Sequence, residues 1–199
     1  ITESGIVEIA EDNPDLSLDF QKTRGATVVS VRNPVFDSQI HRSAHRNEEV
    51  IVKEVVHSIL NYAQGKVIRE MNYYDERFDV ILELVPASAE LEGNTFRNLT
   101  DLNLNDFIDA NGNISFESGD FAYMKIINYG TSTAYFNIVN IQSNGVVNPI
   151  IPEPQDVDGR EYVVQPGDSV LLKRTLLRFG PPYGNDVFKI IASDRPFNL

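Results

Sequence analysis

One stretch of helical periodicity, residues 47–72, stands in a chain whose other apolar segments are short and alternate like β-strands. Asn47 suits the cap position, and two glutamates follow where the positive end of a helix dipole favours acidic side chains. Gly65 and Asn72 are alternative ends, because a glycine inside a helix costs only about 1 kcal/mol. The apolar positions at helical spacing are Val52, Val55, Val56, Ile59, Leu60, Ala63 and Val67.

Strand patterns flank this helix on both sides. Residues 27–31 are rich in β-branched side chains, and residues 78–84 alternate between apolar and polar. From Ile114 onward every apolar segment is short, and Asn144-Gly145 is the strongest two-residue turn pattern in the chain. The sequence therefore predicts an α+β fold, with a small N-terminal sheet and one long helix followed by an antiparallel β-sandwich.

Composition shifts predict three regions along the chain. Residues 1–90 form the α+β segment, and residues 113–199 form the β-sandwich domain. Between them, residues 91–112 are rich in Asn and Asp and lack sustained periodicity, which predicts a polar linker.

Charge and composition exclude several classes of function. Lys and Arg number 17 against 29 Asp and Glu, so the net charge is −12 and nucleic-acid phosphates are repelled. No apolar run approaches the roughly 18 residues of a membrane span, so we expect no membrane insertion. The chain has no cysteine, which excludes disulfides, thiolate metal ligands and a cysteine nucleophile. None of these features indicates a compartment.

Two segments carry residue types that bind metal ions. His41 and His45 are four residues apart, but no carboxylate stands at a fixed offset to complete a zinc site, so loop histidines are favoured. Asp106, Asp109 and Asn111 precede Gly112 as in a calcium loop. The end positions of that loop would be Phe107 and Ser118, which do not fit, so a turn is favoured and the cation question stays open.

Nothing in the sequence points to catalysis by this chain. No serine lies in a Gly-x-Ser-x-Gly turn, and the prolines between Gly180 and Gly184 lack the N–H groups that a phosphate loop uses. His57 lies on the helix, where a structural position is favoured over a catalytic one. We therefore expect no enzyme activity, no catalytic residue, no cofactor and no resident metal.

Aromatic residues are frequent in the β region. Packing within the sandwich is one explanation, and an aromatic-lined groove for a peptide or protein partner is the other. On the second explanation, the candidate partner-binding residues are Tyr183, Phe179, Tyr129 and Tyr135. Tyr183 lies between the turn residues of 179–184 and the terminal strand, so it is the first of these to test.

A series of short motifs resembles a known family. The strand Tyr123-Met-Lys-Ile-Ile-Asn128 is flanked by others in a fixed order: Phe116-Glu-Ser-Gly119-Asp120, Phe136 to Gly145, Val147-Asn-Pro-Ile-Ile-Pro152, Val164-Gln-Pro-Gly167-Asp168 and Gly180-Pro-Pro-Tyr-Gly184. This order resembles the all-β domain of unknown function that is appended to many bacterial caspase-like proteins. The helix and the strand from Phe78 resemble the segment that precedes that domain, so the resemblance covers about residues 50–199.

The resemblance implies an accessory region of a metacaspase-type protein. Caspase-like enzymes use a His/Cys pair, so the catalytic domain would lie outside this cysteine-free chain. The expected function is a non-catalytic regulatory or binding module whose partner is a protein or peptide, above all the associated caspase-like domain. The alternative is a free-standing secreted or surface β-sandwich that binds a glycan or peptide.

Overall fold

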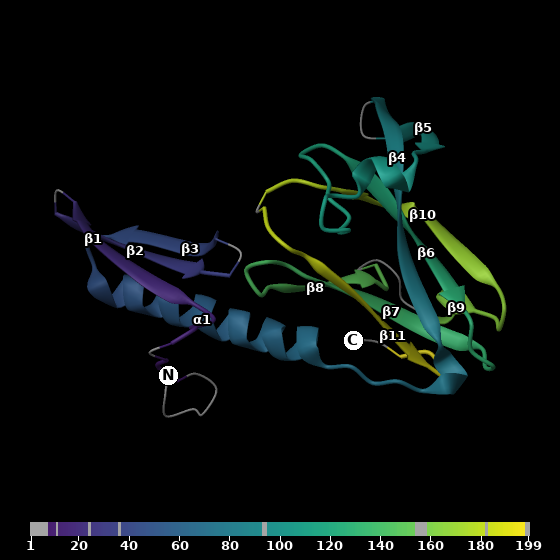
Figure 1. The fold of residues 1–199 in the computed structure, drawn as a ribbon, viewed down its shortest axis with the longest axis horizontal. Coiled ribbons are helices and arrows are strands. Elements are labelled where there is room, and N and C mark those ends of the chain that lie inside the picture. The colour runs from purple at the N-terminus through teal and green to yellow at the C-terminus, as the bar shows by residue number, and fades with distance from the viewer. Residues whose placement is uncertain are drawn as a thin grey trace. The chain divides into compact units, whose positions relative to one another are not determined.

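The computed structural model describes residues 8–10, 12–23, 25–35, 37–92, 95–153, 159–181 and 183–197 (Figure 1). The chain divides into two compact units. The N-terminal unit comprises Ile1–Asn72 with Val139–Asn148 and Pro182–Lys189. The sandwich unit comprises Tyr73–Ile138, Pro149–Pro181 and Ile190–Leu199.

The N-terminal unit is a three-stranded antiparallel sheet packed on one helix. The sheet has the order β1-β2-β3, with β1 at Ser17–Thr23, β2 at Ala26–Asn33 and β3 at Ser38–His45. Helix α1, Glu48–Glu70, covers one face of this sheet (Figure 1). Buried side chains of both layers form the core between them: Val29, Val31, Ile40, Ile51, Val55 and Tyr62.

Helix α1 begins as the sequence predicts and ends at the later of the two predicted stops. The Asn47 side chain accepts a hydrogen bond from the Glu49 N–H at 2.9 Å, which satisfies one free donor of the first turn. The helix continues through Gly65 to Glu70, with Met71 as the C-terminal cap. Position 65 has no room for a larger side chain, because the carbonyl oxygen of Gly145 lies 2.4 Å from where a Cβ would stand.

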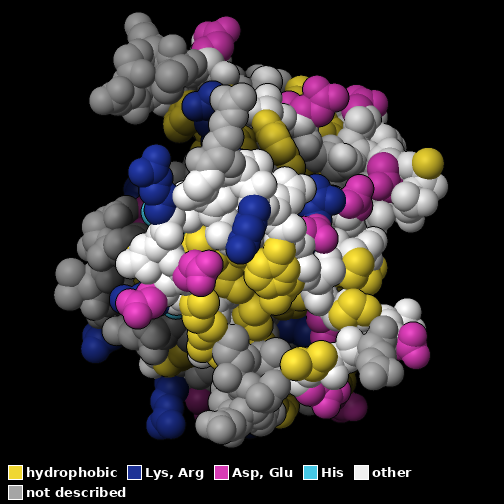
Figure 2. Space-filling model, turned by 90° about the vertical axis from the view of Figure 1, so that its left-hand side faces the viewer, with side chains coloured by type: hydrophobic (Ala, Val, Ile, Leu, Met, Phe, Trp, Pro, Cys, Tyr) yellow, Lys and Arg dark blue, Asp and Glu magenta, His cyan; other side chains and the backbone are white. Residues whose placement is uncertain are grey.

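Only part of the predicted apolar stripe of α1 faces the core. Val55 of this stripe is buried, whereas Val52 and Val67 are 60% and 59% exposed. The other buried apolar side chains of the helix, Ile51 and Tyr62, lie outside the predicted stripe. Val52, Val56 and Leu60 line a shallow hollow on the outer side of the helix. Figure 2 shows exposed hydrophobic side chains (yellow) among polar and charged ones on the face that it draws. The helix thus has two apolar faces, of which the small sheet covers one.

The sandwich unit is built from two layers of antiparallel strands. One sheet has the order β10-β6-β4-β5 and the other the order β11-β7-β8, with β9 paired to β7. The strands are β4 Val80–Glu92, β5 Thr95–Asp101, β6 Phe121–Asn128, β7 Ala134–Ile141, β8 Val147–Ile151, β9 Val163–Val164, β10 Ser169–Arg178 and β11 Val187–Ser193. Short 3₁₀ turns lie at Glu76–Phe78, Leu104–Phe107 and Gly159–Glu161.

Alternate residues of the two central strands fill the space between the sheets. Met124 and Ile126 of β6 and Phe136 and Ile138 of β7 are all 1% exposed or less. Period-two alternation places these residues on the inner faces, as in other sandwiches. The predicted α+β class, with a small sheet, one long helix and a β-sandwich, is confirmed.

Two strands differ from the regions that we predicted. β4 was placed in the α+β segment, but it pairs along Val80–Ala87 with β6, at the centre of the sandwich sheet. The predicted linker at 91–112 contains β5, which pairs with β4. Its side chains, Thr-Phe-Arg-Asn-Leu-Thr-Asp, do not alternate, because β5 is an edge strand with one neighbour. The division into independently folding domains stays a prediction.

Candidate partner-binding surface

The loop between β5 and β6, residues 102–120, is fixed to the end of β10 by stacked aromatic rings. The rings of Phe116 and Phe179 are parallel to within 3°, with their centroids 3.9 Å apart. The ring of Phe107, on the same loop, has its centroid 5.3 Å from that of Phe116. Backbone hydrogen bonds join the same segments, since Gly119 N donates to Phe179 O and Phe179 N donates to Asp120 O. Ring stacking and backbone hydrogen bonds therefore hold the loop against the end of β10.

Asp109 closes the inner part of this loop. Its carboxylate accepts the backbone N–H groups of Asn111 at 2.8 Å and Asn113 at 2.9 Å, and Ile108 forms a β-bridge with Ile114. The backbone hydrogen bond from Asn113 is the main cause that lowers the pKa of Asp109. The predicted cation segment is thus organised by an Asx turn, in which the carboxylate of Asp109 is engaged by loop amides.

Apolar side chains are exposed along the same loop. Leu102, Leu104, Ile108 and Ile114, with Phe96 of the adjacent strand β5, are each between 38% and 43% exposed. We call these five residues the loop surface. Single exposed apolar side chains are ordinary on a folded protein, whereas five on one loop and its neighbouring strand make this the candidate partner-binding surface.

The charge of this segment has one sign. Between Asp101 and Asp120 the sequence holds five acidic residues and neither Lys nor Arg. These are Asp101, Asp106, Asp109, Glu117 and Asp120. The segment therefore carries a large share of the net charge of −12, next to the exposed apolar side chains.

Tyr123 of β6 contacts the residue that directly precedes the loop. Its side chain is fully buried, and its hydroxyl donates a hydrogen bond to the carboxylate of Asp101, the last residue of β5. The Lys173 ammonium lies 5.5 Å from the centre of the Tyr123 ring. Burial, followed by the hydrogen bond to Asp101, raises the pKa of Tyr123 to about 12.

We expect Tyr123 to ionise only near pH 12. The difference between the tyrosinate absorbance titrations of the native chain and of Tyr123→Phe should contain one group with a pKa of about 12. Because this pKa is raised above the unfolded value of about 10, the stability that it contributes is present below pH 10 and is lost as the pH rises towards 12. Asp101→Asn should shift the ionisation downward. A difference curve that titrates at pH 10 would contradict the buried pairing.

The structure does not gather the four aromatic residues predicted to bind a partner. Phe179 is half-buried in the stack with Phe116, so it supports the loop surface. Tyr129 is 62% exposed on the loop that follows the last residue of β6. Phe179 lies at the other end of that strand, because its neighbour Arg178 pairs with Phe121, the first residue of β6. Tyr135 is half-buried beside β9.

Tyr183 belongs to the N-terminal unit and is 66% exposed. The segment that carries it is held by Asp186, whose carboxylate accepts Ser143 N at 3.1 Å and Asn140 Nδ2 at 3.2 Å. An ordered backbone thus presents the Tyr183 ring to solvent. Tyr183 and Tyr129 stay candidate contact residues.

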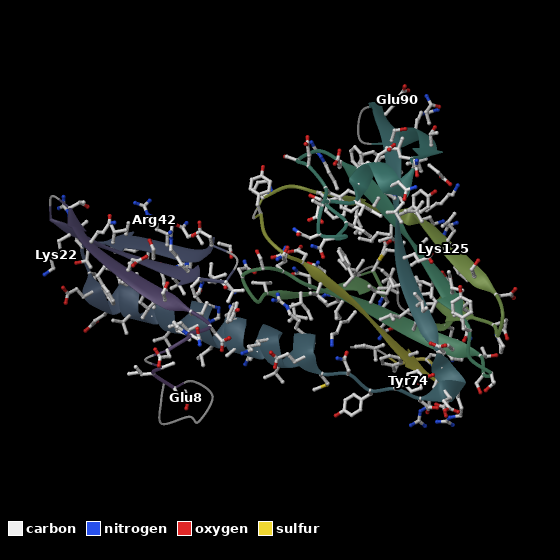
Figure 3. The ribbon with its side chains drawn as sticks, viewed as in Figure 1. Glu8, Lys22, Arg42, Tyr74, Glu90 and Lys125 are labelled. Atoms are coloured by element: carbon white, nitrogen blue, oxygen red, sulfur yellow. The ribbon has the colours of Figure 1, made fainter. Side chains whose placement is uncertain are left out.

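A cluster that sequence reasoning missed lies between β3 and α1. His41, Ser43 and His45 alternate along β3 and face the helix, whereas the intervening Arg42 points away from it (Figure 3). Glu54 of α1 accepts a 2.6 Å hydrogen bond from Ser43 Oγ, and His45 Nε2 lies 3.4 Å from its other oxygen. His41 Nε2 is 3.9 Å from the carboxylate. The Ser43 hydrogen bond is the main cause that lowers the pKa of Glu54.

This cluster ties the sheet to the helix, and its arrangement differs from a Ser–His–acid triad. Four residues along a strand separate the Cα atoms of His41 and His45 by roughly 13 Å, so they approach Glu54 from opposite sides. Ser43 donates to the carboxylate directly, without the intervening imidazole of a Ser–His–acid triad. Among the residues that the structure describes, no three His, Cys, Asp or Glu side chains are grouped to hold a metal ion.

Comparison with known proteins gives no relative for this chain. No family model, no curated protein and no solved structure matches it. Within the described ranges, no helix has the length and apolar character that crossing a bilayer requires.

Proposed function

We propose that the chain is a non-catalytic binding or regulatory region of a caspase-like cysteine peptidase, whose catalytic domain lies outside this sequence. The observation that carries the proposal is the loop surface, where apolar side chains are exposed on a loop fixed by the Phe116–Phe179 stack. An accessory region needs such a surface, because it acts by contact with another domain or with that domain's substrate.

One of the motifs that resemble the family supplies the support of this surface. The Phe116–Asp120 motif supplies the stacked ring and the turn, in which Asp120 accepts the Glu117 N–H at 2.7 Å. Gly119 has a φ of +100°, which favours glycine, and its N–H pairs with Phe179 O. Phe179 directly precedes the Gly180–Gly184 motif. One motif of the resemblance therefore lies in the support beneath the loop surface, which favours the proposal.

The test is a binding measurement with the partner domain. The reading frame that encodes the chain should include a caspase-like domain with a His/Cys pair, and that domain should bind the purified chain in calorimetry. Leu104→Ser with Ile108→Ser should weaken binding by tenfold or more, as expected for central apolar contacts.

The matched control removes exposed apolar side chains elsewhere on the sandwich unit. Ile81 and Leu171 are 43% and 40% exposed, close to Ile108 at 43% and Leu104 at 39%. Ile81→Ser with Leu171→Ser should leave the affinity unchanged within about twofold. A reading frame without a caspase-like domain, or equal losses in the two double variants, would refute the proposal.

A further inference from the structure

We propose that the loop surface binds a peptide segment that combines basic and apolar side chains. This inference rests on the proposed binding function and names the chemistry of the partner. It follows from two properties of the loop, its exposed apolar residues and its uniform negative charge.

The exposed apolar residues of the loop would be covered by apolar side chains of the partner. These residues are Leu102, Leu104, Ile108 and Ile114. The loop beneath them is ordered before any partner arrives, because the Phe116 and Phe179 rings stack and Asp109 caps the inner turn. A preorganised surface loses little conformational entropy on binding. Apolar side chains of a partner therefore gain burial here without the cost of folding the loop.

The charge property selects basic partners. The five carboxylates between Asp101 and Asp120 have no Lys or Arg among them. The cations that the structure places beside the flanking strands contact aromatic rings: the Arg178 guanidinium is 6.0 Å from the centre of the Phe121 ring, and the Lys173 ammonium is 5.5 Å from that of Tyr123. The segment lies within about one Debye length of a docked peptide, so an acidic peptide is repelled and a basic one is attracted.

Two carboxylates on the loop are suited to a test of this selection. Asp109 and Asp120 accept backbone N–H groups of the loop, so changing them would disturb the support. Asp106 and Glu117 are both exposed, and removing their charge keeps these loop hydrogen bonds. Asp106→Asn with Glu117→Gln therefore lowers the negative charge at nearly constant shape.

The experiment measures fluorescence anisotropy of three labelled synthetic peptides of equal length. One alternates Leu and Lys, the second alternates Leu and Glu, and the third alternates Ser and Lys. The Leu–Lys peptide should bind the intact chain at least tenfold more tightly than either of the others. Both Asp106→Asn/Glu117→Gln and Leu104→Ser/Ile108→Ser should weaken its binding by fivefold or more. Ile81→Ser/Leu171→Ser should leave it unchanged.

The outcomes separate this inference from the proposed function. Equal binding of the Ser–Lys peptide would show attraction by charge alone, and equal binding of the Leu–Glu peptide would show apolar contact alone; either overturns the inference. Absence of Leu–Lys binding also overturns it. If the caspase-like domain still binds through Leu104 and Ile108 in that case, the proposed function stands. Circular dichroism of each variant should match the native chain.

Discussion

Replacing Phe136 with alanine should lower the free energy of unfolding by about 3–5 kcal/mol, the range for truncating a buried phenylalanine. Phe136 is 1% exposed and belongs to the cluster that joins the two sheets of the sandwich unit. Its ring meets Tyr162 edge to face, with the centroids 6.1 Å apart. The substitution removes that contact and leaves a cavity between the two close-packed sheets.

Chemical denaturation followed by circular dichroism measures this loss, because the chain has no tryptophan to report on unfolding. Tyr129→Ala is the control, since Tyr129 is also aromatic but 62% exposed on the loop before β7. We expect that variant to lie within about 0.5 kcal/mol of the native chain. A loss below about 1.5 kcal/mol for Phe136→Ala would show that this residue does not fill the core.

Local patterns predicted those parts of the fold that local interactions decide. The Asn47 cap is visible in the sequence because the cap and its partner, the Glu49 N–H, are two residues apart. The Asn144-Gly145 turn is visible for the same reason: Val146 N donates to Asn144 Oδ1, and Gly145 has a φ of +84°. Short apolar runs bounded by turn residues likewise indicated β6 and β7, which are buried on both faces along most of their length.

Contacts between distant residues decide what sequence patterns did not predict. The absence of a carboxylate near His41 and His45 argued against a cluster, yet Glu54 reaches them from the helix that packs on their strand. β5 escaped prediction because an edge strand needs no apolar alternation once β4 pairs with it. Phe116 and Phe179 were noticed separately, but their stack depends on the loop folding back over 63 residues of sequence separation.

Gly65 and Gly145 form a further contact between distant residues that the sequence pattern did not predict. Gly65 suggested a helix stop, but the helix passes through it because the turn at Gly145 lies against the helix backbone. A Cβ on Gly145 would stand 2.3 Å from Tyr62 Cα. Gly145→Ala should therefore lower the free energy of unfolding by about 2–5 kcal/mol, from the left-handed φ and from the forced separation of turn and helix.

Two further alanine variants separate these causes in denaturation experiments. Gly25 has a φ of +86°, nearly that of Gly145, but nothing lies within 4 Å of its added Cβ, so Gly25→Ala should lose only about 1–2 kcal/mol. Gly65→Ala carries no φ penalty and gains about 1 kcal/mol of helix propensity, yet it should still destabilise the chain. If Gly65→Ala instead stabilises the chain, or if Gly145→Ala loses no more than Gly25→Ala, the turn does not pack on the helix. The contact with Gly145 would then not be the reason that position 65 of α1 requires a glycine.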